Sequence, residues 1–377
     1  MAEVRQPSLS RDQLTRRAFL GVLGLSVAGC AVGSDLGSPT SAAAGTWAVP
    51  SETLPHRRTW LAWPSSRFIW GRFLEGVQRD VALVAHTIAR YEPVVMCADP
   101  GAAAKARRLC GRSVQVITSI PVDDCWMRDS GPVFRTSPDG SVGAVGLNFN
   151  GWGGKQTVAQ DQYVAQLVSK RAGAPWTRAT FVGEGGAIEA DGDGTVMATE
   201  SSLVNDNRNP GMSKAEVEAS VLAAYGATKM LWVPGIKGKD ITDDHIDATS
   251  RFIRPGVVMV QLPPAARKDA WAEDAREQFR ILSAVRDAKG RTLTVIPMAG
   301  PETVRSNYRG FLDSYVNFAL AKGVVVTAQF GDEVRDRACR RTLREAFPGR
   351  AVVQLNVDRL HAGGGGIHCI TQQQPLG

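Results

Sequence analysis

One element recurs along this chain, and it constrains the fold more than any other feature. An amphipathic helical stretch leads into a short β-branched strand, and each strand ends in a loop that is mostly rich in Gly and Asp. The expected strands end near residues 119, 182, 233, 297 and 355, roughly 50 to 65 residues apart. This period is long for a solenoid but suits about five blades around one axis. We therefore expect a pseudo-symmetric, five-bladed α/β propeller that forms a single domain over residues 47–377.

Helix and strand signals support the repeat. The helix expected over residues 213–226 starts with a capping box formed by Ser213 and Glu216, and Gly226 or Gly290 is a candidate C-terminal stop. The expected helices cover residues 101–110, 157–171, 213–226, 267–290 and 332–347, and the expected strands cover residues 114–119, 178–182, 229–233, 292–297 and 351–357.

The N-terminal segment has the pattern of an export signal. Arg16 and Arg17 directly precede an apolar run over residues 18–28. This run is too short to span a bilayer as a helix, and it fits the hydrophobic region of a signal peptide. The paired arginines are typical of the twin-arginine export route. We expect residues 1–30 to be a twin-arginine signal peptide.

A second signal follows in the same segment. Residues 27–30, Val-Ala-Gly-Cys, resemble a bacterial lipobox, in which Cys30 becomes the lipidated first residue of the mature protein. Residues 31–46 are small and polar and are expected to form a flexible tether. The expected localisation is outside the cytoplasm, as a cell-surface lipoprotein or as a secreted protein.

Four of the five loops that follow the expected strands carry side chains suited to catalysis. Cys369 follows four glycines, which allow backbone amides to approach a thiolate closely, so it is the best candidate nucleophile. In an extended strand the adjacent His368 would point to the opposite face, which makes it a poor partner for the thiol. His245 and Asp247 are two residues apart, would share one face, and could act together on one substrate.

The same loops contain a concentration of carboxylates. The expected cleft is therefore acidic, although the formal net charge of the chain is +7. A guanidinium ligand fits best, because carboxylates match its planar fork of donors bidentately. Trp126, three residues before Asp129, offers a flat face to an aliphatic stem or a cation. The carboxylates are Asp123, Asp124, Asp129, Glu184, Asp243, Asp244 and Asp247.

Other classes of protein fit the sequence poorly. There is no long Lys/Arg run and no basic-aromatic interleaving, so nucleic acid is not an expected partner. Residues 243–247, Asp-Asp-His-Ile-Asp, could offer metal ligands, but no HExxH motif, EF-hand loop or second clear histidine ligand accompanies them. The cysteines after Cys30 are odd in number and lack CxxC spacing. We expect no metal, no cofactor and no disulfide framework.

An ordered set of motifs resembles the agmatine deiminase and bacterial peptidylarginine deiminase family, within the guanidine-modifying superfamily. The set includes DDCWMRDSGP, NFNGWGGK, EGGAIEADGDGT, DDHIDATSRF and GGGGIHCITQQ, and it covers nearly everything from Trp60 onward. The resemblance implies the five-bladed α/β propeller called the pentein fold. It also implies a hydrolase that acts on the C–N bonds of linear amidines, through a covalent thiouronium intermediate and without a cofactor.

The resemblance further implies a role for each matching residue. Cys369 would attack the guanidinium carbon, and His245 would be the general acid and base. Asp129 and Asp247 would hold the guanidinium nitrogens. Glu184 would orient the histidine.

Trp126 would line the substrate chain.

Two positions depart from the family pattern. Glu189 stands where the family commonly has His, and Asp244 stands where it commonly has Gly. Both extra acids could alter recognition of the far end of the substrate.

Agmatine is the substrate that the resemblance implies, with N-carbamoylputrescine and ammonia as products, a step of putrescine and polyamine synthesis. Deimination of arginine in proteins is the enzymatic alternative. An alternative of another class is a non-catalytic lipoprotein that binds cationic guanidines, and a metal-dependent amidohydrolase is a weaker rival. Oligomeric state has no signal in the sequence.

Overall fold

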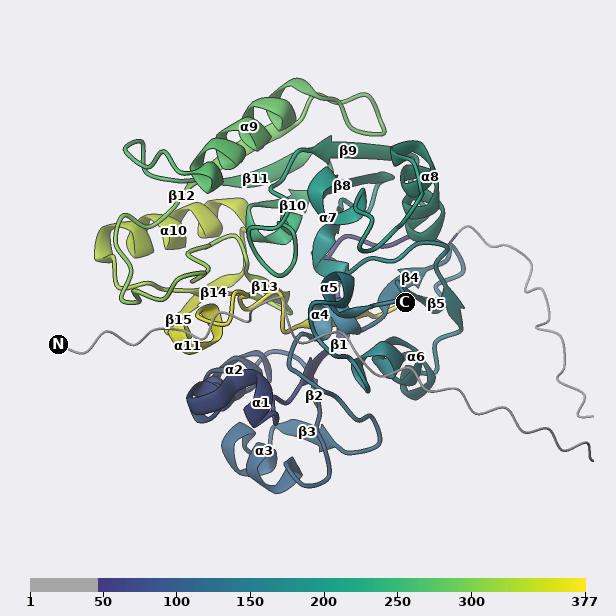
Figure 1. Ribbon diagram of the computed structural model, residues 1–377, viewed down its shortest axis with the longest axis vertical. Helices are drawn as coiled ribbons and strands as arrows, with labels where there is room; N and C mark the ends of the chain where they lie inside the picture. The colour runs from purple at the N-terminus through teal and green to yellow at the C-terminus, as the bar shows by residue number, and fades with distance from the viewer. Residues whose placement is uncertain (1–46) are drawn as a thin grey trace, which may run out of the picture. The chain divides into compact units, whose positions relative to one another are not determined.

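The computed structural model describes residues 47–377, and the predicted signal peptide, lipobox and tether of residues 1–46 lie outside this part. Residues 47–377 belong to one compact unit. Their strands form five separate small sheets set around a common centre (Figure 1). The five-bladed α/β propeller expected from the sequence repeat is confirmed. Within residues 47–377, no helix has the length and apolar character needed to cross a membrane.

Four of the blades share one hydrogen-bonding pattern. The first two strands form an antiparallel pair, and the third strand joins the second in parallel. A parallel connection needs a long crossover, which here contains a helix. The four blades are β4 (Val133–Thr136), β5 (Val142–Gly146) and β6 (Trp176–Arg178); β7 (Ile188–Ala190), β8 (Thr195–Thr199) and β9 (Lys229–Val233); β10 (Ser250–Arg254), β11 (Val257–Leu262) and β12 (Thr294–Ala299); and β13 (Ala319–Ala321), β14 (Val324–Ala328) and β15 (Ala351–Leu355).

The remaining blade joins the two ends of the described chain. β16 (Gln372–Pro375) pairs antiparallel with β1 (His56–Ala62), and β1 is followed in parallel by β2 (Val94–Cys97) and β3 (Val114–Ile117). This pairing closes the ring of blades. The segment just before β16 is thereby brought to the centre of the ring, next to the segment that precedes β1 (Figure 1).

The longer helices lie on the outer side of the ring (Figure 1). α10 illustrates why: it contacts β15 and buries Cys339 and Leu343, while most of its charged side chains remain in solvent. These helices are α2 (Leu74–Ile88), α3 (Ala103–Cys110), α6 (Asp161–Ala172), α8 (Lys214–Tyr225), α9 (Ala270–Ala284) and α10 (Glu333–Ala346).

Helix boundaries test the sequence signals directly. The capping box of α8 is present: Ser213 Oγ accepts from the Glu216 N–H, and the Glu216 carboxylate accepts from the Ser213 N–H. Gly226 ends α8 in the left-handed conformation, with φ +63°. The stop expected at Gly290 for the helix over residues 267–290 is wrong, because this helix, α9, already ends at Ala284 and Gly290 lies in a later turn.

One predicted strand is displaced. The strand expected over residues 178–182 is β6, which ends at Arg178. The side-chain amide of Asn148 donates to the carbonyl oxygens of Ala179 and Phe181, at 2.9 and 2.7 Å. These bonds replace the strand ladder there, so the chain leaves the sheet earlier than β-propensity suggests.

Short helical turns precede the first strands of three blades. They are α4 (Met127–Ser130) before β4, η2 (Gly185–Ala187) before β7 and η3 (Ile246–Ala248) before β10. α4 and η3 carry the buried Asp129 and Asp247, and the buried Glu184 and His245 directly precede η2 and η3. The other short helices are α1 (Arg67–Trp70), η1 (Gly71–Phe73), α5 (Gly151–Gly154), α7 (Glu200–Leu203) and α11 (Asp358–His361).

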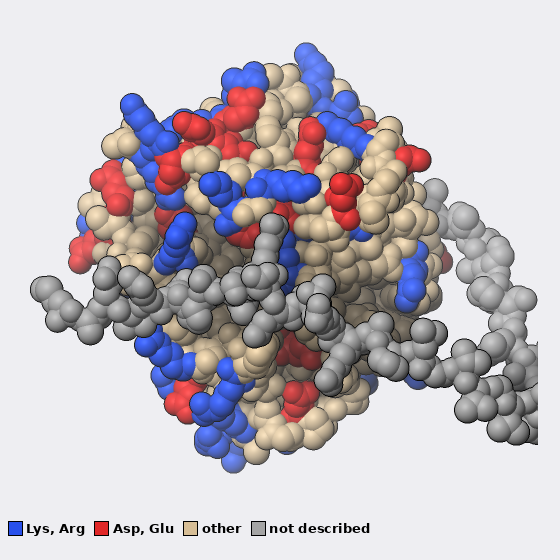
Figure 2. All heavy atoms as spheres, viewed as in Figure 1, with Lys and Arg blue, Asp and Glu red and all other residues tan. Residues whose placement is uncertain are grey.

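The surface of residues 47–377 carries charges of both signs. On the face drawn in Figure 2, Lys and Arg side chains are interspersed with Asp and Glu side chains and do not gather into one basic patch. Binding along a nucleic-acid backbone depends on such a patch.

Candidate active site

The loops between the blades converge at the centre of the ring. Each loop runs from the last strand of one blade to the first strand of the next, so pseudo-symmetry places equivalent positions together. Four loops contribute the candidates expected from the sequence. The fifth loop, after β12, contributes a side chain that sequence reasoning did not identify, Asn317. The residues brought together are Asp129, Glu184, His245 with Asp247, Asn317 and Cys369.

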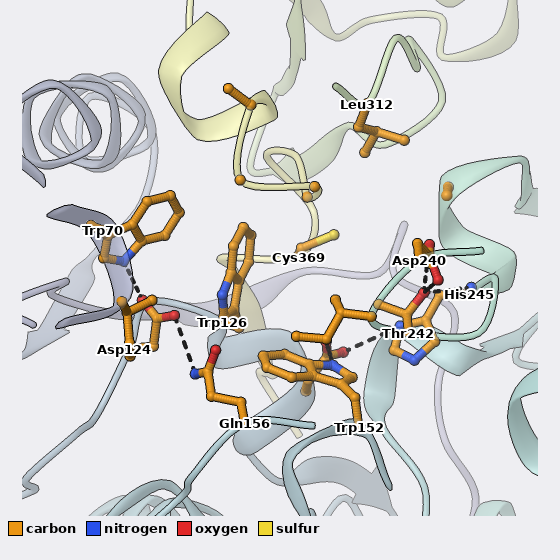
Figure 3. A pocket seen from close by; sticks show the side chains of 18 of the residues that line it. Trp70, Asp124, Trp126, Trp152, Gln156, Asp240, Thr242, His245, Leu312 and Cys369 are labelled. Atoms are coloured by element: carbon orange, nitrogen blue, oxygen red, sulfur yellow. Dashed lines mark hydrogen bonds and ion pairs between the residues drawn. The ribbon is translucent and has the colours of Figure 1, made fainter. Parts of the chain in front are cut away.

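Cys369 is buried at the base of a cavity and is 9% exposed. In Figure 3 its thiol lies between the indole of Trp126 and the imidazole of His245. Asn317 Nδ2 donates to the sulfur at 3.3 Å, and the thiol donates to Asp247 Oδ2 at 3.6 Å. Burial, followed by the nearby Asp247 carboxylate, raises the pKa of the Cys369 thiol. The thiol is therefore protonated in the free protein at neutral pH.

The glycines before Cys369 allow the chain to pass close to other site residues. A Cβ atom on Gly365 would overlap the indole of Trp126, and one on Gly366 would meet the amide of Asn317. Any larger residue would push the nucleophile out of place, because the rigid indole ring cannot give way. The glycine run thus permits the close approach that the sequence suggested.

Asp129 is held by two donors and faces the histidine. Its carboxylate accepts from Trp152 Nε1 at 2.9 Å and from the Gly186 N–H at 3.0 Å. His245 Nδ1 lies 3.8 Å from Asp129 Oδ1. Burial raises the pKa of Asp129 to about 6, and the opposing charge of His245 limits the rise. The carboxyl group is thus ionised at neutral pH and loses its charge below about pH 6.

His245 lies between two carboxylates. Its Nε2 is 3.4 Å from Glu184 Oε2, opposite the Asp129 contact. Glu184 also accepts from Arg208 Nε at 3.0 Å, which fixes its orientation. Burial lowers the pKa of His245, but the charges of Asp129 and Glu184 outweigh burial and raise it to about 9. The imidazole is therefore a cation at neutral pH and can act as a general acid.

The two carboxylate oxygens of Asp247 have different surroundings. Its Oδ2 is 2.7 Å from His368 Nδ1, whereas its buried Oδ1 has no hydrogen-bond partner among residues 47–377. Burial raises the pKa of Asp247. The hydrogen bond to His368 and the charge of His368 lower it by more than burial raises it, so the pKa lies below its ordinary value. Asp247 is therefore ionised, and Oδ1 retains the capacity to accept a further hydrogen bond.

The cavity above these groups has a volume of about 190 Å³. Carboxylates outnumber basic side chains in its lining, which favours a cation, and aromatic rings form its walls (Figure 3). The lining includes the acidic residues Asp124, Asp129, Asp240 and Asp247, the basic residues His245 and Arg359, and the aromatic residues Trp70, Phe73, Trp126, Trp152 and Tyr308.

Four acidic residues singled out in the sequence are used elsewhere. Asp123 accepts backbone N–H groups at the start of α6. Asp243 forms a 2.6 Å ion pair with Arg208, and Asp244 is buried and accepts a backbone N–H. Glu189 pairs with a second buried arginine. None of the four lines the cavity, so the expected effect of Glu189 and Asp244 on the far end of a substrate is wrong as a direct contact.

The local geometry assumed for two histidines is also wrong. His245 and Asp247 lie at a 3₁₀ turn, not in a strand, yet both still face the cavity. His368 and Cys369 lie in a turn that the Thr371 N–H closes on the His368 carbonyl at 3.0 Å. His368 is therefore not turned away from the site: it contacts the same Asp247 carboxylate as the thiol.

Comparison with known proteins identifies the family of this chain. The family model described as Porphyromonas-type peptidyl-arginine deiminase matches residues 48–375. The chain belongs to that family. The resemblance found in the motifs is thereby confirmed, and the ring of five blades is the pentein fold.

Individual members of the family are similar over nearly their full length. A Streptomyces coelicolor relative provisionally named agmatine deiminase is 39% identical over 341 residues, covering 88% of this chain and 99% of that protein. The agmatine deiminase of Pseudomonas aeruginosa is 34% identical over 374 residues, covering 90% and 99%. The solved structure of Enterococcus faecalis agmatine deiminase has a TM-score of 0.82 at 29% identity, covering 88% of this chain and 96% of that one.

Proposed function

We propose that this chain hydrolyses agmatine to N-carbamoylputrescine and ammonia, with Cys369 as the nucleophile. The observation that carries the proposal is the ionised Asp247 carboxylate beside the Cys369 thiol, with Oδ2 3.6 Å from the sulfur, in a cavity where carboxylates outnumber basic side chains. Relatives named agmatine deiminase, similar over nearly their whole length, support the same substrate.

Binding orients the guanidinium for attack. Asp129 and Asp247 accept its N–H groups and hold it flat above the sulfur, and Trp126 lines the path of the aliphatic chain. The bound cation adds a positive charge next to the Cys369 thiol. This charge lowers the pKa of the thiol, which burial and the carboxylates otherwise raise. The substrate thus helps to form the thiolate that attacks it.

The first half-reaction releases ammonia. The thiolate adds to the guanidinium carbon and forms the C–S bond, and His245 donates its proton to one terminal nitrogen as the C–N bond breaks. The product is a covalent thiouronium on Cys369. Glu184 stabilises the protonated imidazole before the transfer, because it lies 3.4 Å from Nε2.

The second half-reaction restores the enzyme. His245, now neutral, removes a proton from water, and the resulting hydroxide adds to the thiouronium carbon. The C–S bond then breaks and the proton of the added hydroxyl passes to the departing sulfur, which leaves the neutral ureido product and the Cys369 thiol. The overall reaction consumes one water and releases one ammonia, so its balance calls for no redox or group-transfer cofactor.

A substrate panel tests the proposal. Residues 31–377 are incubated with agmatine, free arginine and an arginine-containing peptide, and ammonia and ureido products are measured. We expect agmatine to be turned over and Cys369→Ala to abolish turnover. Citrulline formed in the peptide with agmatine untouched would establish protein-arginine deimination instead. Binding of agmatine without ammonia release would establish a non-catalytic guanidine-binding protein.

We further propose that the protein is exported by the twin-arginine route and anchored through a lipid on Cys30. Arg16, Arg17 and the lipobox-like residues 27–30 support this, as does the start of the family match at residue 48, after these segments. Mass spectrometry of the mature N-terminus tests it: a diacylated Cys30 is expected, and Cys30→Ala removes the lipid. An unprocessed N-terminus would refute the proposal.

A further inference from the structure

A buried chain of hydrogen bonds runs behind Asp247, on the side away from the cavity. His368 Nδ1 lies 2.7 Å from Asp247 Oδ2, and His368 Nε2 lies 3.1 Å from Glu52 Oε1. Each ring nitrogen of His368 thus lies within hydrogen-bonding distance of a carboxylate oxygen. His368 therefore bridges two carboxylates, of which only Asp247 lines the cavity.

Glu52 is fixed from three blades at once. It lies in the segment before β1 and accepts from Arg128 Nη1 at 2.9 Å, from Arg251 Nη2 at 2.7 Å and from Gln373 Nε2 at 3.0 Å. Arg128 comes from α4, Arg251 from β10 and Gln373 from β16. Because its partners come from different blades, the position of Glu52 is set by the ring as a whole.

A metal ion is the other occupant that this cluster could suggest. Ligand atoms of Glu52, Glu189 and His368 all lie within 4.8 Å of one another. However, Arg251 binds both carboxylates, with Nε 2.5 Å from Glu189 Oε1, and Arg128 binds Glu52 as well. Two guanidinium cations already neutralise the two carboxylates. A divalent cation would have to displace them, so the cluster is organised around arginine and histidine.

The bridge decides how Asp247 is presented. His368 holds Oδ2, whereas the buried Oδ1 has no hydrogen-bond partner among residues 47–377. Oδ2 is also the oxygen 3.6 Å from the Cys369 sulfur. Without His368, the Asp247 carboxylate could rotate about its χ2 bond and turn away from a flat guanidinium.

We propose that Glu52 and His368 are positioning residues, which hold Asp247 for guanidinium binding without touching the substrate. The role assigned to Asp247 rests on the proposed function. Glu52 acts one step further back: it orients the imidazole, and the imidazole orients Asp247. Outer partners of this kind typically change affinity or activity by roughly 10- to 100-fold when they are removed from metal sites.

Two substitutions of His368 separate positioning from simple packing. An Asn side-chain amide places a donor near the position of Nδ1 and can still reach Asp247, whereas a Gln amide places its donor near Nε2 and reaches Glu52. Positioning predicts that His368→Asn retains most of kcat/KM for agmatine and that His368→Gln loses roughly 10- to 100-fold. If His368 acts only by packing, His368→Gln should retain more of kcat/KM than His368→Asn, because Gln is closer to His in volume. His86→Asn, on the exposed face of α2, is the control and should match the wild type.

A second measurement does not depend on turnover or on His368 variants. Methylguanidine should protect Cys369 from alkylation by iodoacetamide. The extent of alkylation is measured by mass spectrometry of the Cys369 peptide. In Glu52→Gln, which preserves side-chain size, half-protection should require roughly tenfold more methylguanidine. Unchanged protection there, or equal activity of the two His368 variants, would overturn the proposal. A wild type that is protected but releases no ammonia from agmatine would instead refute the proposed function.

Discussion

The alkaline side of the pH profile gives the sharpest test of the proposed acid. His245 must be protonated to release ammonia, and its pKa is raised to about 9. Because the pKa is raised, the active form is present at neutral pH and is lost as the pH rises through about 9. We therefore expect kcat/KM for agmatine, which reports on the free enzyme, to fall above that pH.

Glu184→Gln should shift the alkaline limb of the pH profile, which is the range where kcat/KM falls as the pH rises. The substitution keeps the shape of the side chain but removes the negative charge 3.4 Å from His245 Nε2. A hydrogen bond to a charged group contributes about 1.5–3 kcal/mol, and one pKa unit corresponds to about 1.4 kcal/mol. The limb should therefore shift downward by about one to two pH units. Arg208 stays paired with Asp243 at 2.6 Å, so the chain should still fold.

The assay is ammonia release from agmatine at limiting substrate, from about pH 5 to about pH 10, a range chosen to extend about one pH unit beyond each expected limb. Glu189→Gln is the matched control, because it also neutralises a buried glutamate but one paired with Arg251 and not with His245. Its alkaline limb should stay near that of the wild type, whatever its effect on the maximum rate. An alkaline limb that stays in place in Glu184→Gln would show that His245 is not the acid, or that Glu184 does not set its pKa.

Three further outcomes follow from the site. Trp152→Phe removes a donor to Asp129, whose pKa is raised to about 6 and which must be ionised to bind a cation, so the acid limb should move upward by about one unit. Gly186→Ala would place a Cβ atom 2.8 Å from Asp129 Oδ1 and should lower kcat/KM by about 100-fold, whereas Gly101→Ala, with no atom within 4 Å, should leave it unchanged. Exhaustive chelation should leave turnover of agmatine intact, and a loss that added metal restores would contradict the metal-free mechanism.

Local signals predicted the fold well where one sequence pattern specified one backbone geometry. The capping box of Ser213 and Glu216 and the left-handed Gly226 depend on neighbours within one or two turns, and all appear in α8. Where a distant side chain intervened, prediction failed. Asn148 competes for the carbonyls after Arg178, and it lies some thirty residues away in sequence.

The candidate site divides in the same way. Cys369 and His245 could be singled out from residue type and loop position, because few side chains can serve as a nucleophile or an acid. Asp129 was one of seven loop carboxylates, and the family resemblance selected it. Asn317 and Trp152 could not be singled out, because amides and indoles are common and only contact with Cys369 and Asp129 distinguishes them. Trp152 lies in the NFNGWGGK motif and Asn317 in the segment SYVNFALAKG, which also resembles the family, and this resemblance was the one signal available.

By itself, the sequence determined the repeat, the acidic loops and the types of side chain available for chemistry, since periodicity and residue type are properties of the chain alone. Only the tertiary structure decided which groups share a proton or a substrate. His368 is the clearest case: a turn, not a strand, directs its imidazole to Asp247 and Glu52. The pKa of His245 likewise arises from carboxylates on other blades. Charges interact through distance in space and through burial, and closure of the ring fixes both.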